Sequence, residues 1–86
     1  MKGHAIPIPA DAPKVGETYR HYKGDMYEVF ELALHSNDDE WMVVYKPLYE
    51  CPDAHLFTRP VREWNDVVEW PTESGVSVKR FIHVAE

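Results

Sequence analysis

Five side chains in this sequence could together bind an anion: His21, His35, Tyr45, Arg59 and Arg80. Imidazole, phenol and guanidinium groups all donate hydrogen bonds to carboxylate or phosphate oxygens. If the strand faces that carry them converge, they would line a pocket suited to a carboxylate, a phosphate or a nucleotide base. The alternative is that they are hydrogen-bonded parts of the core, as most buried polar groups are. The sequence leaves both interpretations open.

The predicted elements place these residues on strands, because residues two apart along a strand share one face. Tyr19 and His21 therefore share a face, with Arg20 and Tyr22 on the other. In the pair Arg80-Phe81 one side chain points inward, and Phe81 is the better core candidate. Arg59 is expected either to contact a ligand or to pair with Glu63 or another acid of a helix that follows it.

A metal site is not predicted. Cys51 and His55 are four residues apart, with His35 as a further possible ligand. Structural zinc sites normally use four ligands in paired spacings, so a single Cys-x₃-His is a weak signal. The acidic run Asp38-Asp39-Glu40 lacks the ligand spacing of a calcium loop and is expected to be a solvated hairpin tip. No cofactor is predicted.

No catalytic residue is predicted either. Ser36 adjoins His35, but neighbours on a turn seldom aim their functional atoms at each other, and Ser36 suits an ordinary turn. The four glycines are scattered, so they do not form a phosphate-binding loop. An enzyme is therefore less expected than a binding module.

Length and charge limit the function further. The 86 residues suffice for one domain, and 44% hydrophobic residues argue against disorder. A net charge of −6 is unfavourable for duplex DNA, whose non-specific affinity comes from neutralised phosphates. Cys51 is the single cysteine, so an intrachain disulfide is impossible. Without an apolar run of membrane-spanning length or a signal-peptide h-region, we expect a cytoplasmic protein that does not enter a membrane.

The pattern of strands and turns predicts a mainly β domain over residues 15–86, preceded by a proline-rich extended arm over residues 1–14. We expect a five-stranded SH3-like small barrel, or a strongly curled antiparallel sheet, with one short helix before the last strand. The expected segments are strands at 18–22, 26–34, 41–49, 56–58 and 76–84 and a helix at 61–69. Trp64 is expected to pack that helix on the sheet, and Pro47 to mark an edge or a bulge.

Several short pieces of the chain occur together in one order and spacing over residues 16–84. They are Tyr19-Arg20-His21-Tyr22-Lys23-Gly24, Tyr27-Glu28-Val29, Ala33 with His35-Ser36, Val43-Val44-Tyr45 with Leu48-Tyr49, Arg59-Pro60 and Arg80-Phe81. In these pieces the sequence resembles the family known as domain of unknown function 1653. The resemblance implies a small bacterial β-rich domain with no established activity.

Three functions remain open from the sequence. The leading hypothesis is a non-enzymatic module that recognises a small anionic ligand, or an extended peptide at an open sheet edge near Pro47. The second is single-stranded nucleic acid binding through exposed aromatic side chains, which the net charge of −6 disfavours. The third is a small hydrolytic enzyme with His21 or His35 as acid or base. The oligomeric state is not predicted.

Overall fold

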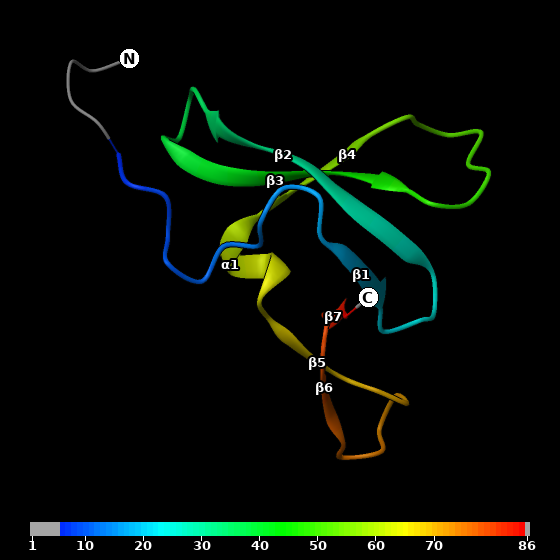
Figure 1. Cartoon of the computed structure of the whole chain (residues 1–86). Helices are drawn as coiled ribbons and strands as arrows, with labels where there is room; N and C mark the ends of the chain where they lie inside the picture. Colours follow the sequence, from blue (N-terminus) through cyan, green and yellow to red (C-terminus); the bar gives the residue numbers. More distant parts are fainter. Residues whose placement is uncertain (1–5, 86) are drawn as a thin grey trace.

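A computed structural model describes residues 6–85. Its main element is an open antiparallel sheet of five strands in the order β4-β3-β2-β1-β7, from which a separate hairpin of β5 and β6 projects (Figure 1). The elements in chain order are β1 (Thr18–His21), β2 (Met26–His35), β3 (Glu40–Pro47), β4 (Phe57–Pro60), α1 (Val61–Trp64), β5 (Val67–Glu69), β6 (Ser77–Lys79) and β7 (Phe81–Val84).

The predicted hairpin of β1 and β2 is confirmed. Gly24 has a φ of +111°, a backbone conformation that a side chain would strain. Its N–H donates to the carbonyl of His21 over 2.7 Å, and the N–H of His21 donates to the carbonyl of Asp25 over 2.8 Å. The turn therefore fixes the backbone of His21 at the end of β1.

A β-bulge in β2 corrects the phase of the apolar pattern. Val29 pairs with Tyr45, Glu31 pairs with Val44, and Phe30 between them is unpaired and 52% exposed. Without this extra residue, Leu32 would fall on the face opposite Val29. With it, Leu32 pairs with Val43 and packs against the core.

The core lies between one face of the sheet and α1. Its buried residues come from β2, β3, α1 and β7, and they are Val29, Val43, Tyr45, Val61, Trp64 and Phe81. Trp64 is 1% exposed and stacks on Phe81 with ring centroids 3.8 Å apart and 5° between the planes. The rings of Tyr45 and Tyr19 contact the Trp64 ring in T-shaped geometry, with centroid distances of 5.0 and 5.2 Å. As predicted, Trp64 packs the helix on the sheet.

The predicted helix over 61–69 is wrong beyond Trp64. Asp66 donates its N–H to Glu63, and Val67–Glu69 then form β5, paired with β6. Helical spacing of valines was the misleading signal, since β-branched residues also favour strands. Val67 is 55% exposed, so it is not the core position that the helical pattern required.

In residues 6–85 no helix is long and apolar enough to cross a bilayer.

The predicted last strand over 76–84 is interrupted at Arg80. Residues 77–79 pair with β5 in the projecting hairpin, and residues 81–84 pair with β1 as β7. Since 77–79 are used in that local hairpin, β4 and β7 are the edges of the main sheet and pair with no further strand within the described residues. The five-stranded antiparallel sheet of the prediction is therefore observed, and within residues 6–85 it does not close into a barrel. β5 and β6 also separate the helix from β7, the last strand.

Pro47 is the last residue of β3, where it pairs with Tyr27 on β2. β4 pairs with β3 only along 42–45, so β3 is an inner strand up to that point and has a free side at Pro47. The missing N–H of proline is accommodated there because no ladder bond to β4 is needed.

Part of the proline-rich arm docks on the domain. The carbonyl of Ile6 accepts a hydrogen bond from Trp41 Nε1 at 3.1 Å, and that of Asp11 accepts one from Asn65 Nδ2 at 2.9 Å. Pro13 is buried and Ala12 packs against the core. The arm passes α1 on its way to β1 (Figure 1). Residues 1–5 of the arm lie outside the described residues.

Replacing Trp64 tests how far the fold depends on its ring. Trp64→Ala is expected to lower the free energy of unfolding by about 3–5 kcal/mol, because a large buried ring is lost. Trp64→Phe is expected to cost less, since it keeps the stacking and removes an indole N–H that is buried without a partner. Urea denaturation of both variants measures this. A loss below about 1 kcal/mol for Trp64→Ala would contradict the central position of the ring.

Candidate functional site

Three of the five candidate residues lie on the core side of the sheet. His21 pairs with Phe81, Tyr45 with Phe57, and Arg59 with Val43, so their side chains share the face that α1 covers. The ring of Phe81 connects them. Its centroid is 5.2 Å from His21, 5.5 Å from Tyr45 and 5.7 Å from the guanidinium carbon of Arg59. The faces of His21 and Tyr45 therefore do converge.

Arg80 reaches this region from the junction of β6 and β7. Its carbonyl accepts a hydrogen bond from the N–H of Tyr22 at 3.0 Å, and its own N–H donates to Asp66 at 2.9 Å. These bonds fix Arg80 beside the end of β1. Phe81, the next residue, is buried, which confirms it as the core member of the pair.

His21 lies within electrostatic range of both arginines. Burial is the main cause that lowers its pKa, and the charges of Arg59, Arg80 and then Lys23 lower it further, opposed by Asp25. Its Nδ1 accepts a hydrogen bond from the N–H of Lys23 at 3.2 Å, so the neutral imidazole carries its proton on Nε2. We call His21, Arg59 and Arg80 the basic cluster.

The two arginines of the basic cluster lack some of the hydrogen bonds and carboxylate partners that a charged guanidinium group usually has. The Nε of each is shielded from solvent and makes no hydrogen bond within residues 6–85. Arg59 meets Glu63 at 3.5 Å, which is one of the two alternatives expected for it, but Glu63 also faces Arg62 at 3.6 Å. For the side chain of Arg80 the described part of the chain offers no carboxylate within ion-pair distance. An anion that reaches the outer nitrogens of the two guanidinium groups would balance their positive charge.

Tyr45 and His35 occupy different positions from the basic cluster. Tyr45 is 5% exposed and forms part of the core beneath it, with its ring 5.3 Å from Tyr27. His35 lies at the far end of β2, where it pairs with Glu40 and its Nδ1 is 3.7 Å from Asp38. The structure therefore does not bring His35 together with the other four residues.

Two neighbours of the basic cluster were not among the candidate residues. Tyr22 lies 4.3 Å from His21, ring to ring, and Lys23 Nζ lies over the Tyr22 ring at 5.8 Å. Their position directly after His21 in the sequence was the available signal. Trp70 contacts Tyr22 at 5.3 Å, and no sequence pattern indicated that contact.

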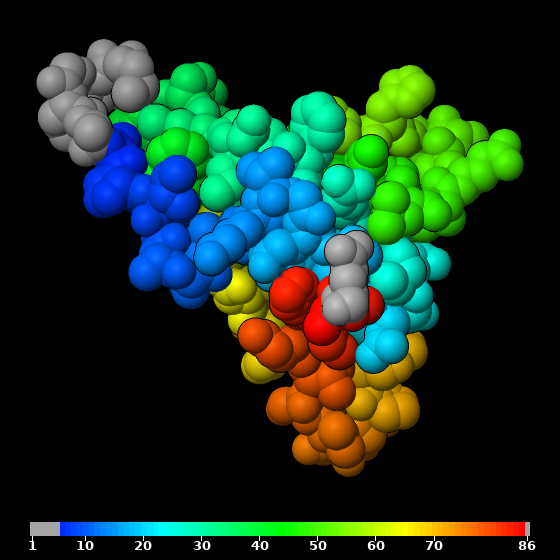
Figure 2. All heavy atoms as spheres, in the orientation of Figure 1, coloured from blue at the N-terminus to red at the C-terminus, as the bar shows by residue number. Residues whose placement is uncertain are grey.

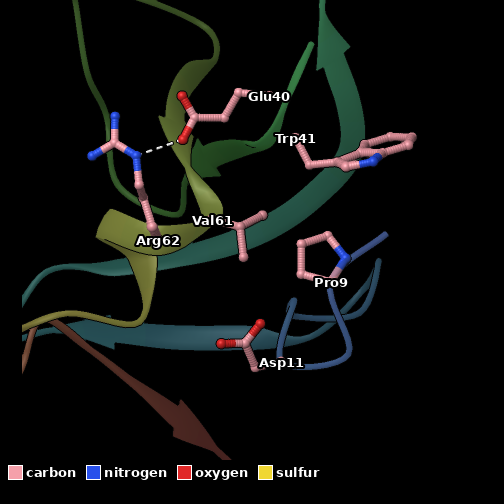
Figure 3. Close-up of a pocket in the computed structure, with 6 residues that line it drawn as sticks. All are labelled: Pro9, Asp11, Glu40, Trp41, Val61 and Arg62. Carbon is pink, nitrogen blue, oxygen red and sulfur yellow. Dashed lines mark hydrogen bonds and ion pairs between the residues drawn. The ribbon is translucent and has the colours of Figure 1, made fainter. Parts of the chain in front are cut away.

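A hollow of about 180 Å³ lies elsewhere, between the arm and α1. Pro9, Trp41 and Val61 form its apolar sides, with Asp11 at one end (Figure 3). Its charged edge is already paired, since Arg62 Nε donates to Glu40 Oε2 at 2.6 Å. This hollow results from the packing of the arm, and we prefer the basic cluster as the candidate site because its donors lack partners.

A second hollow, of about 290 Å³, lies beside Glu17 and His83 at the edge strand β7. Glu17 Oε1 accepts hydrogen bonds from Lys14 N–H at 2.8 Å and from the Tyr19 hydroxyl at 3.0 Å. The bond from Lys14 is the main cause that lowers the pKa of Glu17, and burial with the Glu17 contact raises the pKa of Tyr19 to about 12. This carboxylate holds the start of the domain together.

The described residues contain no group of three or more His, Cys, Asp or Glu side chains placed to hold a metal ion. Cys51 is a free, partly buried thiol in the loop between β3 and β4, and His55 in the same loop is exposed.

The site thus defines a small antiparallel-sheet domain with a basic cluster beside its aromatic core. The model of the family described as protein of unknown function (DUF1653) matches residues 17–83, so the chain belongs to this family. It is similar to a crystal structure of a DUF1653 protein from Bordetella bronchiseptica, with 39% identity and a TM-score of 0.69 over 78% of this chain and 82% of that one. No curated protein sequence is significantly similar.

Removing a neighbouring charge is expected to raise the pKa of His21. In the wild-type protein this pKa lies below the ordinary value of 6.5, and in Arg80→Gln it should move upward, because one cation no longer opposes the imidazolium. An NMR titration of the His21 ring measures both. Lys46→Gln, which removes a cation paired with Glu28 on the other face of the sheet, is the control and should leave this pKa unchanged. An unaltered His21 pKa in Arg80→Gln would show that the two groups are not close.

Glu17 is expected to stabilise the protein in a pH-dependent way. Its pKa is lowered in the folded state, so its contribution is present above pH 4.5, the ordinary value, and is lost as the pH falls through the folded value. Glu17→Gln should therefore lower the free energy of unfolding by about 1 kcal/mol at pH 7. Denaturation at pH 7 and at pH 3 tests this. A difference between the two proteins that does not shrink at the lower pH would contradict it.

Proposed function

We propose that this DUF1653 domain is a non-enzymatic binding module whose basic cluster takes a small anionic ligand. The supporting observation is that Arg59 and the half-buried His21 lie beside one aromatic ring, Phe81, while the charge of Arg80 also acts on His21. Arg59 and Arg80 each offer charged N–H donors to a carboxylate or phosphate. His21 adds the Nε2–H that its bond from Lys23 leaves on the imidazole.

The balance of charge around the cluster also favours an anion. Arg59, Arg80 and Lys23 all act on His21 as cations, and Asp25 is the acid that opposes them. With Glu63 counted against Arg59, the neighbourhood keeps one excess positive charge in a chain whose net charge is −6. A region of opposite sign to the whole molecule attracts an anion that the rest of the surface repels.

An extended peptide is the weaker candidate. The edges of the main sheet are β4 and β7, each of four residues, which offer few ladder bonds to an added strand.

A hydrolytic role has less support than either anion or peptide binding. Nδ1 of His21 already accepts the backbone N–H of Lys23, and within residues 6–85 no hydroxyl or thiol bonds to the imidazole. Anion binding requires only the hydrogen-bond donors that His21, Arg59 and Arg80 already have in this structure.

The proposal is tested by titrating inorganic phosphate into the ¹⁵N-labelled protein at low salt. Amide shifts are expected around residues 20–25, 59 and 79–81. Arg80→Gln should weaken phosphate binding about tenfold or more, because a hydrogen bond to a charged group contributes about 1.5–3 kcal/mol. Lys46→Gln removes the same charge from the opposite face and should bind as wild type does.

Two outcomes would contradict the proposal. One is the absence of localised shifts at phosphate concentrations up to the millimolar range. The other is equal weakening by Arg80→Gln and Lys46→Gln, which would mean that the anion responds to overall charge and not to the basic cluster. Thermal denaturation of both variants shows that they remain folded.

A further inference from the structure

An aromatic shelf adjoins the basic cluster and has no role in simple anion binding. It consists of Tyr22 and Trp70. The Tyr22 ring lies 4.3 Å from the His21 ring, and Trp70 meets Tyr22 edge-on at 5.3 Å and 69°. Trp70 is 39% exposed although it is one of the largest apolar side chains in the domain.

The shelf is attached to the same backbone that positions Arg80. The N–H of Tyr22 donates to Arg80, and the N–H of Arg80 donates to Asp66, the residue before β5. Trp70 directly follows β5, and its N–H donates to the carbonyl of Val76 at 2.9 Å. The base of the β5–β6 hairpin is thus fixed to the end of β1, and the β1–β2 turn lies against the segment after β5 (Figure 2).

The exposed ring of Trp70, connected to the basic cluster through Tyr22, matches one class of anion better than others. A phosphate or carboxylate alone would bind to the basic cluster and would not contact Trp70. A ligand that joins a phosphate to a flat ring would use both, because nucleobases stack on exposed aromatic side chains. Lys23, with its Nζ over Tyr22 at 5.8 Å, adds a cation at the same edge.

We propose that the ligand is a nucleoside monophosphate, whose phosphate is held by His21, Arg59 and Arg80 and whose base stacks on Trp70. This inference rests on the proposed function, since it assigns the phosphate to the same basic cluster. A free mononucleotide fits better than a nucleic acid strand. Each further phosphate of a strand would meet a chain of net charge −6, and affinity for strands comes from neutralising many phosphates.

The experiment compares three ligands by NMR titration against wild type: inorganic phosphate, ribose 5-phosphate and adenosine 5′-monophosphate. The nucleotide is expected to bind about tenfold more tightly than ribose 5-phosphate, because stacking adds to the phosphate contacts. In Trp70→Ala this gain should disappear while the affinity for phosphate is unchanged. Trp70→Tyr keeps a ring at the position and should retain most of the gain. Val76→Ala shortens another exposed apolar side chain of the same hairpin and is the control for general effects on it.

The outcomes separate the two proposals. Phosphate binding at the basic cluster without a gain from the base overturns the nucleotide inference and leaves the proposed function intact. A gain that survives Trp70→Ala also overturns it, because the base would then lie elsewhere. Failure of phosphate, ribose 5-phosphate and nucleotide alike overturns both proposals. A 5′-phosphorylated trinucleotide that binds more tightly than the mononucleotide would keep the stacking chemistry but overturn the assignment to a free nucleotide.

Discussion

The stacking of Trp64 on Phe81 is the contact on which the rest of this domain depends. The main sheet is open, so its core face needs a cover, and the described helix that supplies one has four residues. Such a helix buries enough area only by contributing a very large side chain. Trp64 does so, and its parallel contact with Phe81 joins α1 to β7, the edge strand farthest from β4 in the sheet order.

The basic cluster is a consequence of that packing. Phe81 presents its ring to His21 as well as to Trp64, and the guanidinium of Arg59 lies over the same ring. An arginine beside aromatic rings loses water that would otherwise solvate it, and a neighbouring cation adds repulsion. The lowered pKa of His21 is one expression of this environment. Groups held in this way favour an anion more strongly than the same groups would on an open surface.

Much of the fold could be predicted from the sequence, because strand periodicity and turn residues are local signals. The hairpin around Gly24 and the strand before Pro47 are both of this kind. The helix was overextended because Val67 and Val68 suit a helical pattern and a strand equally well. Pairing with β6, a contact made later in the chain, decided between them.

The sequence by itself determined that this is one small β domain with an aromatic core and a Tyr-, His- and Arg-containing set on its strands, since composition and alternation act locally. The tertiary structure alone decided which of these groups meet. It separated His35 from the set and broke the last predicted strand at Arg80, because residues 77–79 pair with β5 and residues 81–84 pair with β1. Which residues come together depends on long-range pairing and on the bulge at Phe30, and no local pattern specifies either.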